Sequence, residues 1–511
     1  LDRWHAGHQA ADIHMIRLHG KIAELTALAL IAAYVASYAT ARDPIANAIC
    51  VGLIVGIAAV VYARSFTWGT AMVLAELVGG SLGRLFVLPG GDGLASVRMG
   101  LFAVALLGTA WHIIRHEERR NWIVKRLRGN VGVIVFACLL LIALARGLWQ
   151  FPIASVIADA NAYAFLLLLP TILLVCREEA DRSRVLSVVF GAAAAVSLLS
   201  LVVLFLFTHG VSSTVASPLY KWVRDFGLGE ATPMATGFVR VFFQAHIWTM
   251  IVALWSVVLL TCARSTTPRW IWVIGVLSAG TVALSFSRTL WIATLVGILV
   301  FGFLLALRRK TRSMVPRLLL VCVVVVSLGA VLPFLVTRGA GGLALQRATT
   351  MTGEPAADSR LNLLKVMWPA IQEHVVLGWG FGKSLTYETR DPRLLAYFPD
   401  GRYTTTAFEW GWLDFWLKLG IVGLLTMLLW VTSLFFNATQ LFRDSNEMAW
   451  PAAFAASTVA IAVAHVFSPW LNHPLGFGYL MLVTAIVDRL QRAWINQKNR
   501  SETSASPATI L

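Results

Sequence analysis

Long apolar runs recur along almost the whole chain, and they constrain its fold more than any other feature. Each run has roughly 17 to 25 residues, the length that a helix needs to cross the hydrocarbon core of a bilayer. Of the 511 residues, 58% are hydrophobic and only 13% are charged. This composition excludes an ordinary soluble enzyme. The sequence therefore predicts an all-α, polytopic membrane protein.

We count about fourteen transmembrane helices, with twelve as the lower bound. The runs cover residues 22–41, 46–63, 69–88, 98–114, 131–149, 155–176, 184–207, 241–262, 270–286, 289–307, 315–336, 411–436, 448–467 and 473–490. A polar segment, residues 337–410, separates the first eleven runs from the last three. We expect four parts: transmembrane helices 1–11 in residues 1–336, one long extracytoplasmic helical loop in 337–410, helices 12–14 in 411–490, and a cytoplasmic tail in 491–511.

The basic residues between the runs predict the orientation of the chain. Lys and Arg concentrate in residues 115–130, 177–183, 263–269 and 308–314 and in the C-terminal tail. Short cytoplasmic loops are enriched in these residues, so we expect both termini in the cytoplasm and the polar segment outside. The net charge of +16 fits an acidic lipid surface. Membrane lipids are therefore the expected partners of these charges, and no nucleic acid is expected.

The sequence predicts neither a metal site nor a cofactor. All five cysteines lie in or at the ends of apolar runs, and the outer loops carry no acidic metal-binding motif. We interpret the histidines near the start of the chain as part of a surface segment.

Arginines on the expected outer face are the sharpest chemical signal. Residues 208–240, 286–289 and 337–410 should converge there, and all three contain arginine despite the usual bias. Arg288 lies in SFSRTLW between two apolar runs, with almost no loop that would let it reach water. A guanidinium there is costly unless it is paired, so an anionic ligand is the functional interpretation and a structural ion pair is the alternative. The same reasoning makes Arg240, at the start of an apolar run, a candidate ligand-binding residue.

Within the polar segment, the pattern predicts one amphipathic helix over residues 359–373, lying along the outer membrane surface. Its apolar positions are Leu361, Leu364, Met367, Trp368 and Ile371. Asp358 or Ser359 is the expected N-cap, which places Arg360 in the first turn. The following GWGFG, residues 378–382, lacks the Lys-Ser pair and preceding strand of a phosphate-binding loop.

Glu409 lies just before the twelfth run, beside Phe408, Trp410 and Trp412. A carboxylate at an apolar interface binds its proton more tightly than one in water, which suits a general base near neutral pH. Trp410 and Trp412 offer surfaces on which sugar rings could stack. A carboxylate that only stabilises the start of the next helix is an equally good interpretation of Glu409.

Three stretches in this order resemble the O-antigen ligase and O-antigen polymerase superfamily. They are SFSRTLW, SRLNLLKVMWPAIQEHVVLGWGFG and EWGWLDFWLKLGIVGLL. The resemblance implies an integral membrane glycosyltransferase of the GT-C type in the bacterial inner membrane, with its active site on the periplasmic face. Its donor would be a polyprenyl (undecaprenyl) diphosphate-linked glycan, and its acceptor a glycan or glycolipid. Arg288 and Arg360 would correspond to the family's two arginines at the donor diphosphate.

This chain departs from the family pattern in one place. Glu409 stands where family members usually carry histidine, and Trp410 stands where asparagine follows it. Glu409 could still accept the proton of an attacking sugar hydroxyl. The base could also lie elsewhere, and His374 is a weaker substitute. The expected reaction is metal-independent inverting transfer, catalysed by Glu409, Arg288 and Arg360, in a polysaccharide polymerase or ligase.

Two other functions stay open on the sequence. A transporter or flippase for a lipid-linked glycan would use charged residues inside its spans, for which Glu76, Arg84 and Arg146 are the candidates. A peptidoglycan-type polymerase of the shape, elongation, division and sporulation family would use an acidic residue of the outer loop. Asp358, Glu388 and Asp391 are the candidates for that base.

Overall fold

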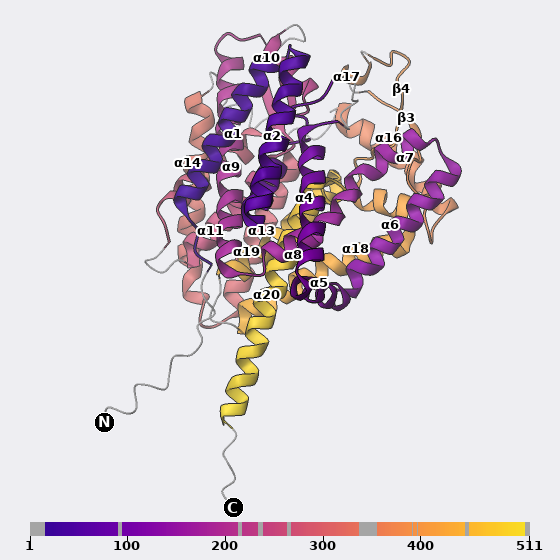
Figure 1. Cartoon of the computed structure of the whole chain (residues 1–511). Coiled ribbons are helices and arrows are strands. Elements are labelled where there is room, and N and C mark those ends of the chain that lie inside the picture. The colour runs from indigo at the N-terminus through magenta and orange to yellow at the C-terminus, as the bar shows by residue number, and fades with distance from the viewer. Residues whose placement is uncertain are drawn as a thin grey trace, which may run out of the picture.

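The computed structural model describes residues 16–89, 95–212, 217–233, 239–262, 267–336, 355–390, 392–395, 397–444 and 449–505. Most of these residues belong to long helices that pack side by side, and two short hairpins are the only sheets in this part of the chain (Figure 1). A lobe made of α6, α7, α16, α18 and the second hairpin lies to one side of the other helices (Figure 1).

The first half of the chain contributes nine α-helices and one 3₁₀ helix. They are α1 (Gly20–Thr40), α2 (Pro44–Arg64), α3 (Phe66–Gly79), α4 (Val97–Arg115), α5 (Glu117–Gly129), α6 (Val131–Gln150), α7 (Ile153–Ala160), η1 (Asn161–Leu168), α8 (Leu169–Val175) and α9 (Glu179–Thr208).

The second half adds both hairpins and the remaining helices. They are α10 (Pro218–Asp225), β1 (Gly229–Pro233), β2 (Val239–Phe243), α11 (His246–Cys262), α12 (Trp270–Leu284), α13 (Arg288–Leu307), η2 (Arg312–Met314), α14 (Val315–Val336), α16 (Pro355–Glu373), β3 (Leu385–Glu388), α17 (Pro392–Leu395), β4 (Arg402–Thr405), α18 (Gly411–Asp444), α19 (Ala449–Phe467), η3 (Trp470–Asn472) and α20 (Pro474–Ala505).

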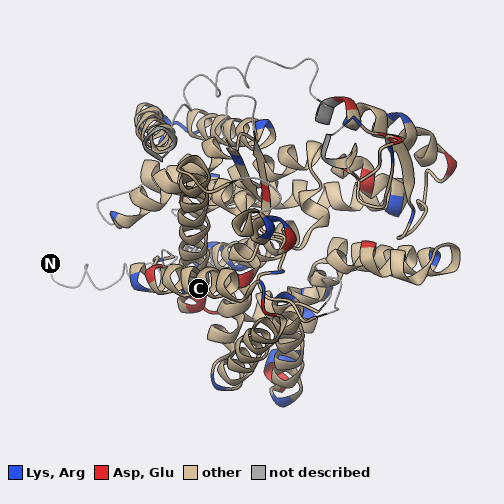
Figure 2. Cartoon of the chain, turned by 90° about the horizontal axis from the view of Figure 1, so that it is seen from above, with Lys and Arg blue, Asp and Glu red and all other residues tan. Residues whose placement is uncertain are grey.

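The two ends of the helix bundle differ. The end that we call the loop end holds α10, α16, α17 and the β3–β4 hairpin, and the opposite end, the tail end, holds α5 and the C-terminal part of α20 (Figure 1). Figure 2, viewed from the loop end, shows acidic and basic residues together on the lobe at the right of the view.

Ten helical segments within the described residues are long and apolar enough to cross a membrane. The other four predicted runs correspond to α3, α11, α12 and α20. The first three of these are apolar but shorter, with 14, 17 and 15 residues. The structure thus confirms an all-α polytopic membrane protein, and the count of fourteen crossings stays a prediction.

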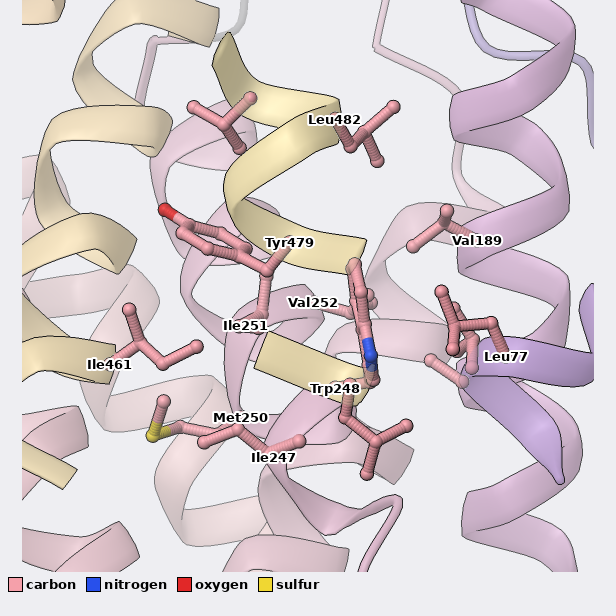
Figure 3. Close-up of a cluster of buried hydrophobic side chains, with 14 of the residues drawn as sticks. Leu77, Val189, Ile247, Trp248, Met250, Ile251, Val252, Ile461, Tyr479 and Leu482 are labelled. Atoms are coloured by element: carbon pink, nitrogen blue, oxygen red, sulfur yellow. The ribbon is translucent and has the colours of Figure 1, made fainter. Parts of the chain in front are cut away.

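The short helix α11 lies at the centre of the bundle. Trp248, Trp255 and nearly every other residue of α11 are buried, so this helix contacts protein on all sides. Figure 3 shows part of this core, where Leu77, Trp248 and Tyr479 come together from α3, α11 and α20. Helices such as α2 and α14 instead expose most of their apolar side chains, which suits contact with lipid.

Several helices begin, end or change type at other residues than the apolar runs predict. The run 241–262 begins as strand β2, because VRVFF alternates buried and half-buried side chains. The run 69–88 stops being helical at Gly79, and the chain then turns through Ser81, whose φ is 55°. The run 155–176 contains a 3₁₀ stretch, η1, between α7 and α8. The last helix continues past residue 490 to Ala505, into the expected tail.

The helix of the polar segment is confirmed, but its start and its buried face differ from the prediction. α16 begins at Pro355, so Asp358 and Ser359 lie inside the helix and Arg360 lies in its second turn. Leu363, Met367 and Ile371 are buried, whereas Leu361 and Trp368 are exposed. The β3–β4 hairpin, with Leu385 opposite Thr405, was not predicted. Residues 337–354 and Asp391 lie outside the described part of the chain.

Candidate active site

Arg360 and Glu409 form an ion pair in the lobe. Arg360 projects from α16, Glu409 lies two residues before α18, and the Nε of Arg360 donates to the carboxylate of Glu409. The indole Nε1 of Trp410 donates to the carbonyl oxygen of Arg360 at 2.9 Å, which ties the two segments together a second time. The Arg360 and Glu409 side chains are 35% and 51% exposed, so both can reach a ligand. About half of the Glu409 side chain is therefore exposed, whereas the sequence predicted an apolar interface around it.

The buried face of α16 explains why these residues meet. Leu363, Met367 and Ile371 pack with Phe408 and Leu417 in a small hydrophobic cluster that is separate from the main core. Phe408 directly precedes Glu409, so burying Phe408 under α16 brings the carboxylate beside Arg360. Burial of apolar area thus positions a polar pair at its edge.

Arg240 and Arg288 lie close to one turn at the loop end. The Nε of Arg240, on β2, donates to the carbonyl oxygen of Ser285 at 2.8 Å. Phe286 has a φ of 47°, a strained conformation for a residue that is not glycine. Ser287 then caps α13 by accepting from the backbone N of Leu290, and Arg288 is the first helical residue. The turn therefore holds Arg288, half-buried, at a helix N-terminus, where an anion is favoured.

Helix α19 connects the two groups of residues. It packs along α13, where Gly297 lies against the backbone of Ala456. At its other end, the Phe467 ring lies 5.7 Å from the Trp410 ring, and the indole of Trp412 donates to the carbonyl oxygen of Ala462 at 3.2 Å. Both indole N–H groups are thus used in protein contacts, while the half-buried rings of Trp410 and Trp412 keep part of their surface exposed.

The glycine turn after α16 inserts among the helices of the lobe. Trp379 N donates to Leu417 O, and Gly380 N donates to Lys418 O. Phe381 N donates to Ala143 O of α6, and Arg146 donates to Gly378 O at 2.8 Å. Gly380 has a φ of 86°, and a Cβ on it would lie 2.7 Å from Ala143 O. The turn is therefore a structural insert, and its backbone donors are not available for phosphate.

A buried cluster of charged residues, Asp159, Asp414 and Lys418, contacts this turn, and the sequence analysis did not predict it. The Nζ of Lys418 lies 2.6 Å from Asp159 Oδ1 and 2.7 Å from Asp414 Oδ1. The Asp159 Oδ2 accepts from Gly382 N at 2.9 Å, and Asn472 donates to Asp414. The charged residues inside the runs 155–176 and 411–436 could have indicated this cluster, because charged side chains are rare within membrane spans unless they are paired or functional.

The structure also places a histidine close to the position where the family histidine is missing. The ring of His465 on α19 lies 4.7 Å from the Trp412 ring and contacts the backbone of Gly411. His465 is fully buried, and its Nδ1 accepts from Leu471 N at 3.1 Å. Its ring is therefore packed among the helices and closed off from solvent. His374 stacks edge-on against Trp379 at 4.1 Å and helps to shape the glycine turn.

Residues 273–428 match the family model described as O-antigen ligase. We call residues 273–428, where this match lies, the O-antigen ligase domain. The match confirms the resemblance to the O-antigen ligase and polymerase superfamily. It also supports a glycosyltransferase-like membrane enzyme. No curated protein matches the chain.

The O-antigen ligase domain contains most of the residues that the sequence singled out. Arg288, Arg360, Glu409, Trp410 and Trp412 all lie within residues 273–428, whereas Arg240 precedes them. Of the charge cluster, the domain contains Lys418 and Asp414 but neither Asp159 nor Asn472. Among the described residues, no group of three or more His, Cys, Asp or Glu side chains is placed to hold a metal ion. The roles of the individual residues stay predictions.

Two of the three charged residues considered for a transporter have protein partners, and the third, Arg84, is exposed. Glu76 forms a buried ion pair with Arg98 at 2.8 Å, and Arg146 holds the glycine turn. Both therefore have structural roles within the bundle.

Proposed function

We propose that this protein transfers a glycan from a polyprenyl diphosphate donor to a sugar hydroxyl, as a polysaccharide polymerase or an O-antigen ligase. The loop end would face the periplasm of the bacterial inner membrane, and both termini would face the cytoplasm. The observation that supports the proposal most directly is the Arg360–Glu409 pair, which lies within the O-antigen ligase domain at the loop end.

In this proposal the arginines bind the leaving group. Arg288 and Arg360 present guanidinium groups, which bind phosphate oxygens in a bidentate manner and stabilise negative charge as it develops. Arg240 would support the turn before Arg288 through its bond to Ser285. Trp410 and Trp412 would contact the glycan with the exposed parts of their rings.

The ion pair suggests how the base becomes available. In the free protein Arg360 holds the carboxylate of Glu409, so this carboxylate is not free to accept a hydrogen bond from an acceptor hydroxyl. When the donor diphosphate binds, Arg360 would exchange Glu409 for phosphate oxygens. The freed carboxylate then accepts the proton of the acceptor hydroxyl, whose oxygen attacks the anomeric carbon. The bond from that carbon to the diphosphate breaks with inversion, and the diphosphate leaves with the bonding electrons.

A transfer assay in proteoliposomes tests the proposal. The donor is the lipid-diphosphate glycan fraction of cells that lack the enzyme, and the acceptor is the glycan or glycolipid fraction of the same cells. We expect Arg288→Ala and Arg360→Ala to slow transfer by about 10²–10³, as for other groups that stabilise a transition-state charge. Glu409→Gln should slow transfer by about 10²–10⁴, the contribution of a general base.

Arg224→Ala is the matched control, because Arg224 is an exposed arginine of α10 at the loop end and outside the O-antigen ligase domain. It should transfer at the wild-type rate. Transfer should also persist in EDTA. Full transfer by both arginine variants, at matched expression, would exclude this mechanism. No transfer by the wild-type protein would favour a transporter.

A further inference from the structure

The β3–β4 hairpin carries a row of aromatic rings beside the proposed site. The ring of Phe398 lies 5.3 Å from that of Tyr403, and the ring of Tyr403 lies 5.9 Å from that of Tyr387. Tyr397 stands next to this row and is 70% exposed, while Phe398 is 39% exposed. We call Tyr387, Tyr397, Phe398 and Tyr403 the aromatic row. Tyr387 and Tyr403 are half-buried, so the exposed part of the row is Tyr397 and Phe398. Adjoining exposed aromatic side chains can mark a binding surface.

The backbone holds the exposed end of the row in place. Phe398 N and Tyr397 N both donate to Leu394 O, which closes a tight turn after α17. Gly401 N donates to Phe398 O, and Thr389 N donates to Gly401 O at 2.8 Å. The rings are therefore presented from a hydrogen-bonded turn, so little ordering entropy is lost when they bind a ligand.

The hairpin is fastened to the turn of α16 that carries Arg360. The Ser359 hydroxyl lies 3.0 Å from the Thr389 hydroxyl and accepts from Arg390 N at 3.2 Å. Asn362 donates to Glu388 O at 3.1 Å. Ser359 and Asn362 flank Arg360 in the sequence, and strand β4 ends four residues before Glu409. The aromatic row and the ion pair are thus parts of one small structure.

The chemistry of the row fits a carbohydrate. The face of an aromatic ring carries partial negative charge, and the axial C–H groups of a pyranose carry partial positive charge, so the two stack. Tyrosine also offers a hydroxyl to the sugar.

We propose that the aromatic row binds the glycan chain a few sugar units away from the reacting hydroxyl. This inference rests on the proposed function and deepens it, because it names the surface that holds the glycan during transfer. A site that grips several sugars would keep a growing or incoming chain in place between transfers.

The test measures glycan binding separately from transfer. The probe is the glycan that mild acid releases from the lipid-diphosphate fraction of the host cells, so it carries neither lipid nor diphosphate. Saturation-transfer NMR with the full-length protein in nanodiscs reports its binding. We expect Tyr397→Ala with Phe398→Ala to weaken binding by about tenfold or more, the loss typical of truncated aromatic anchors.

Two controls keep the outcomes distinct. Trp149→Ala removes an aromatic ring that is 90% exposed at the end of α6, and it should bind the glycan as the wild type does. Arg288→Ala should lose transfer but keep glycan binding, because the probe has no diphosphate. Wild-type glycan binding by the double variant, or no binding by the wild type, would overturn the inference. Wild-type transfer by Arg288→Ala would instead count against the proposed function.

Discussion

Two clusters of opposite charges in the same lobe differ mainly in their exposure to water. Arg360 and Glu409 are about one-third and one-half exposed, whereas the side chains of Asp159, Lys418 and Asp414 are 5%, 3% and 2% exposed. An exposed pair gives up little stability when it separates, so its members can exchange partners. A buried cluster cannot lose one member without leaving an unpaired charge in an apolar region. The first cluster is therefore suited to chemistry and the second to holding the lobe together.

The largest effect on stability should come from removing the central charge of the buried cluster. Lys418→Met leaves Asp159 and Asp414 facing each other without a cation, which should destabilise the protein by about 3–5 kcal/mol. Thermal unfolding of the purified protein in detergent measures this loss. Lys418→Met combined with Asp159→Asn and Asp414→Asn removes the uncompensated charges and should recover much of it. If Lys418→Met alone unfolds at the wild-type temperature, the cluster does not hold the lobe.

The second largest effect should come from the glycine turn that the cluster supports. Gly380→Ala forces a side chain into a φ of 86° and brings its Cβ 2.7 Å from Ala143 O and Gly147 N. We expect a loss of about 1–3 kcal/mol from the strain alone, measured by the same unfolding experiment. Gly52→Ala is the control, because nothing lies within 4 Å of its Cβ on α2. Equal stability of the two variants would contradict the tight insertion of the turn.

The exposed pair should behave in the opposite way when its charges are exchanged. Arg360→Glu with Glu409→Arg keeps an ion pair between the same positions, so stability should stay within about 1 kcal/mol of wild type. Transfer should nevertheless be lost, because the guanidinium no longer projects from α16 and the carboxylate no longer follows Phe408. Unfolding and the transfer assay together measure the two outcomes. Active transfer by the exchanged variant would show that only the net charge matters.

The two clusters also differ in how far the sequence could predict them. The membrane helices followed from their apolar runs, and the family pattern singled out Arg288, Arg360 and Glu409. Lys418 and Asp414 lie four residues apart in a run that otherwise reads as lipid-facing, which was a signal for a buried pair. Asp159 is remote in the sequence, so no local pattern could assign it to Lys418.

The hairpin was missed for a different reason. Its strands have four residues each and are joined by a long loop, without the tight-turn dipeptides that identify hairpins. The strands form because Leu385 and Tyr387 pack against the cluster under α16, which is a tertiary effect. The start of α16 was misplaced because Asp358 and Ser359 are good N-caps, yet the helix begins earlier, at a proline that favours a first turn.

The smallest predicted effect tests whether Arg360 changes partner from Glu409 to the donor diphosphate or stays paired with Glu409. If Glu409 competes with the donor diphosphate for Arg360, then Glu409→Gln removes the competitor and should bind diphosphate more tightly, by up to about fivefold for an exposed pair. Farnesyl diphosphate is a suitable probe, and isothermal titration in nanodiscs measures its affinity. Arg360→Ala should bind it more weakly, and Arg224→Ala should match the wild type. Weaker binding by Glu409→Gln would mean that the carboxylate holds Arg360 in its binding position, and unchanged binding would mean that Glu409 and the diphosphate do not compete. Either result would contradict the exchange of partners by Arg360.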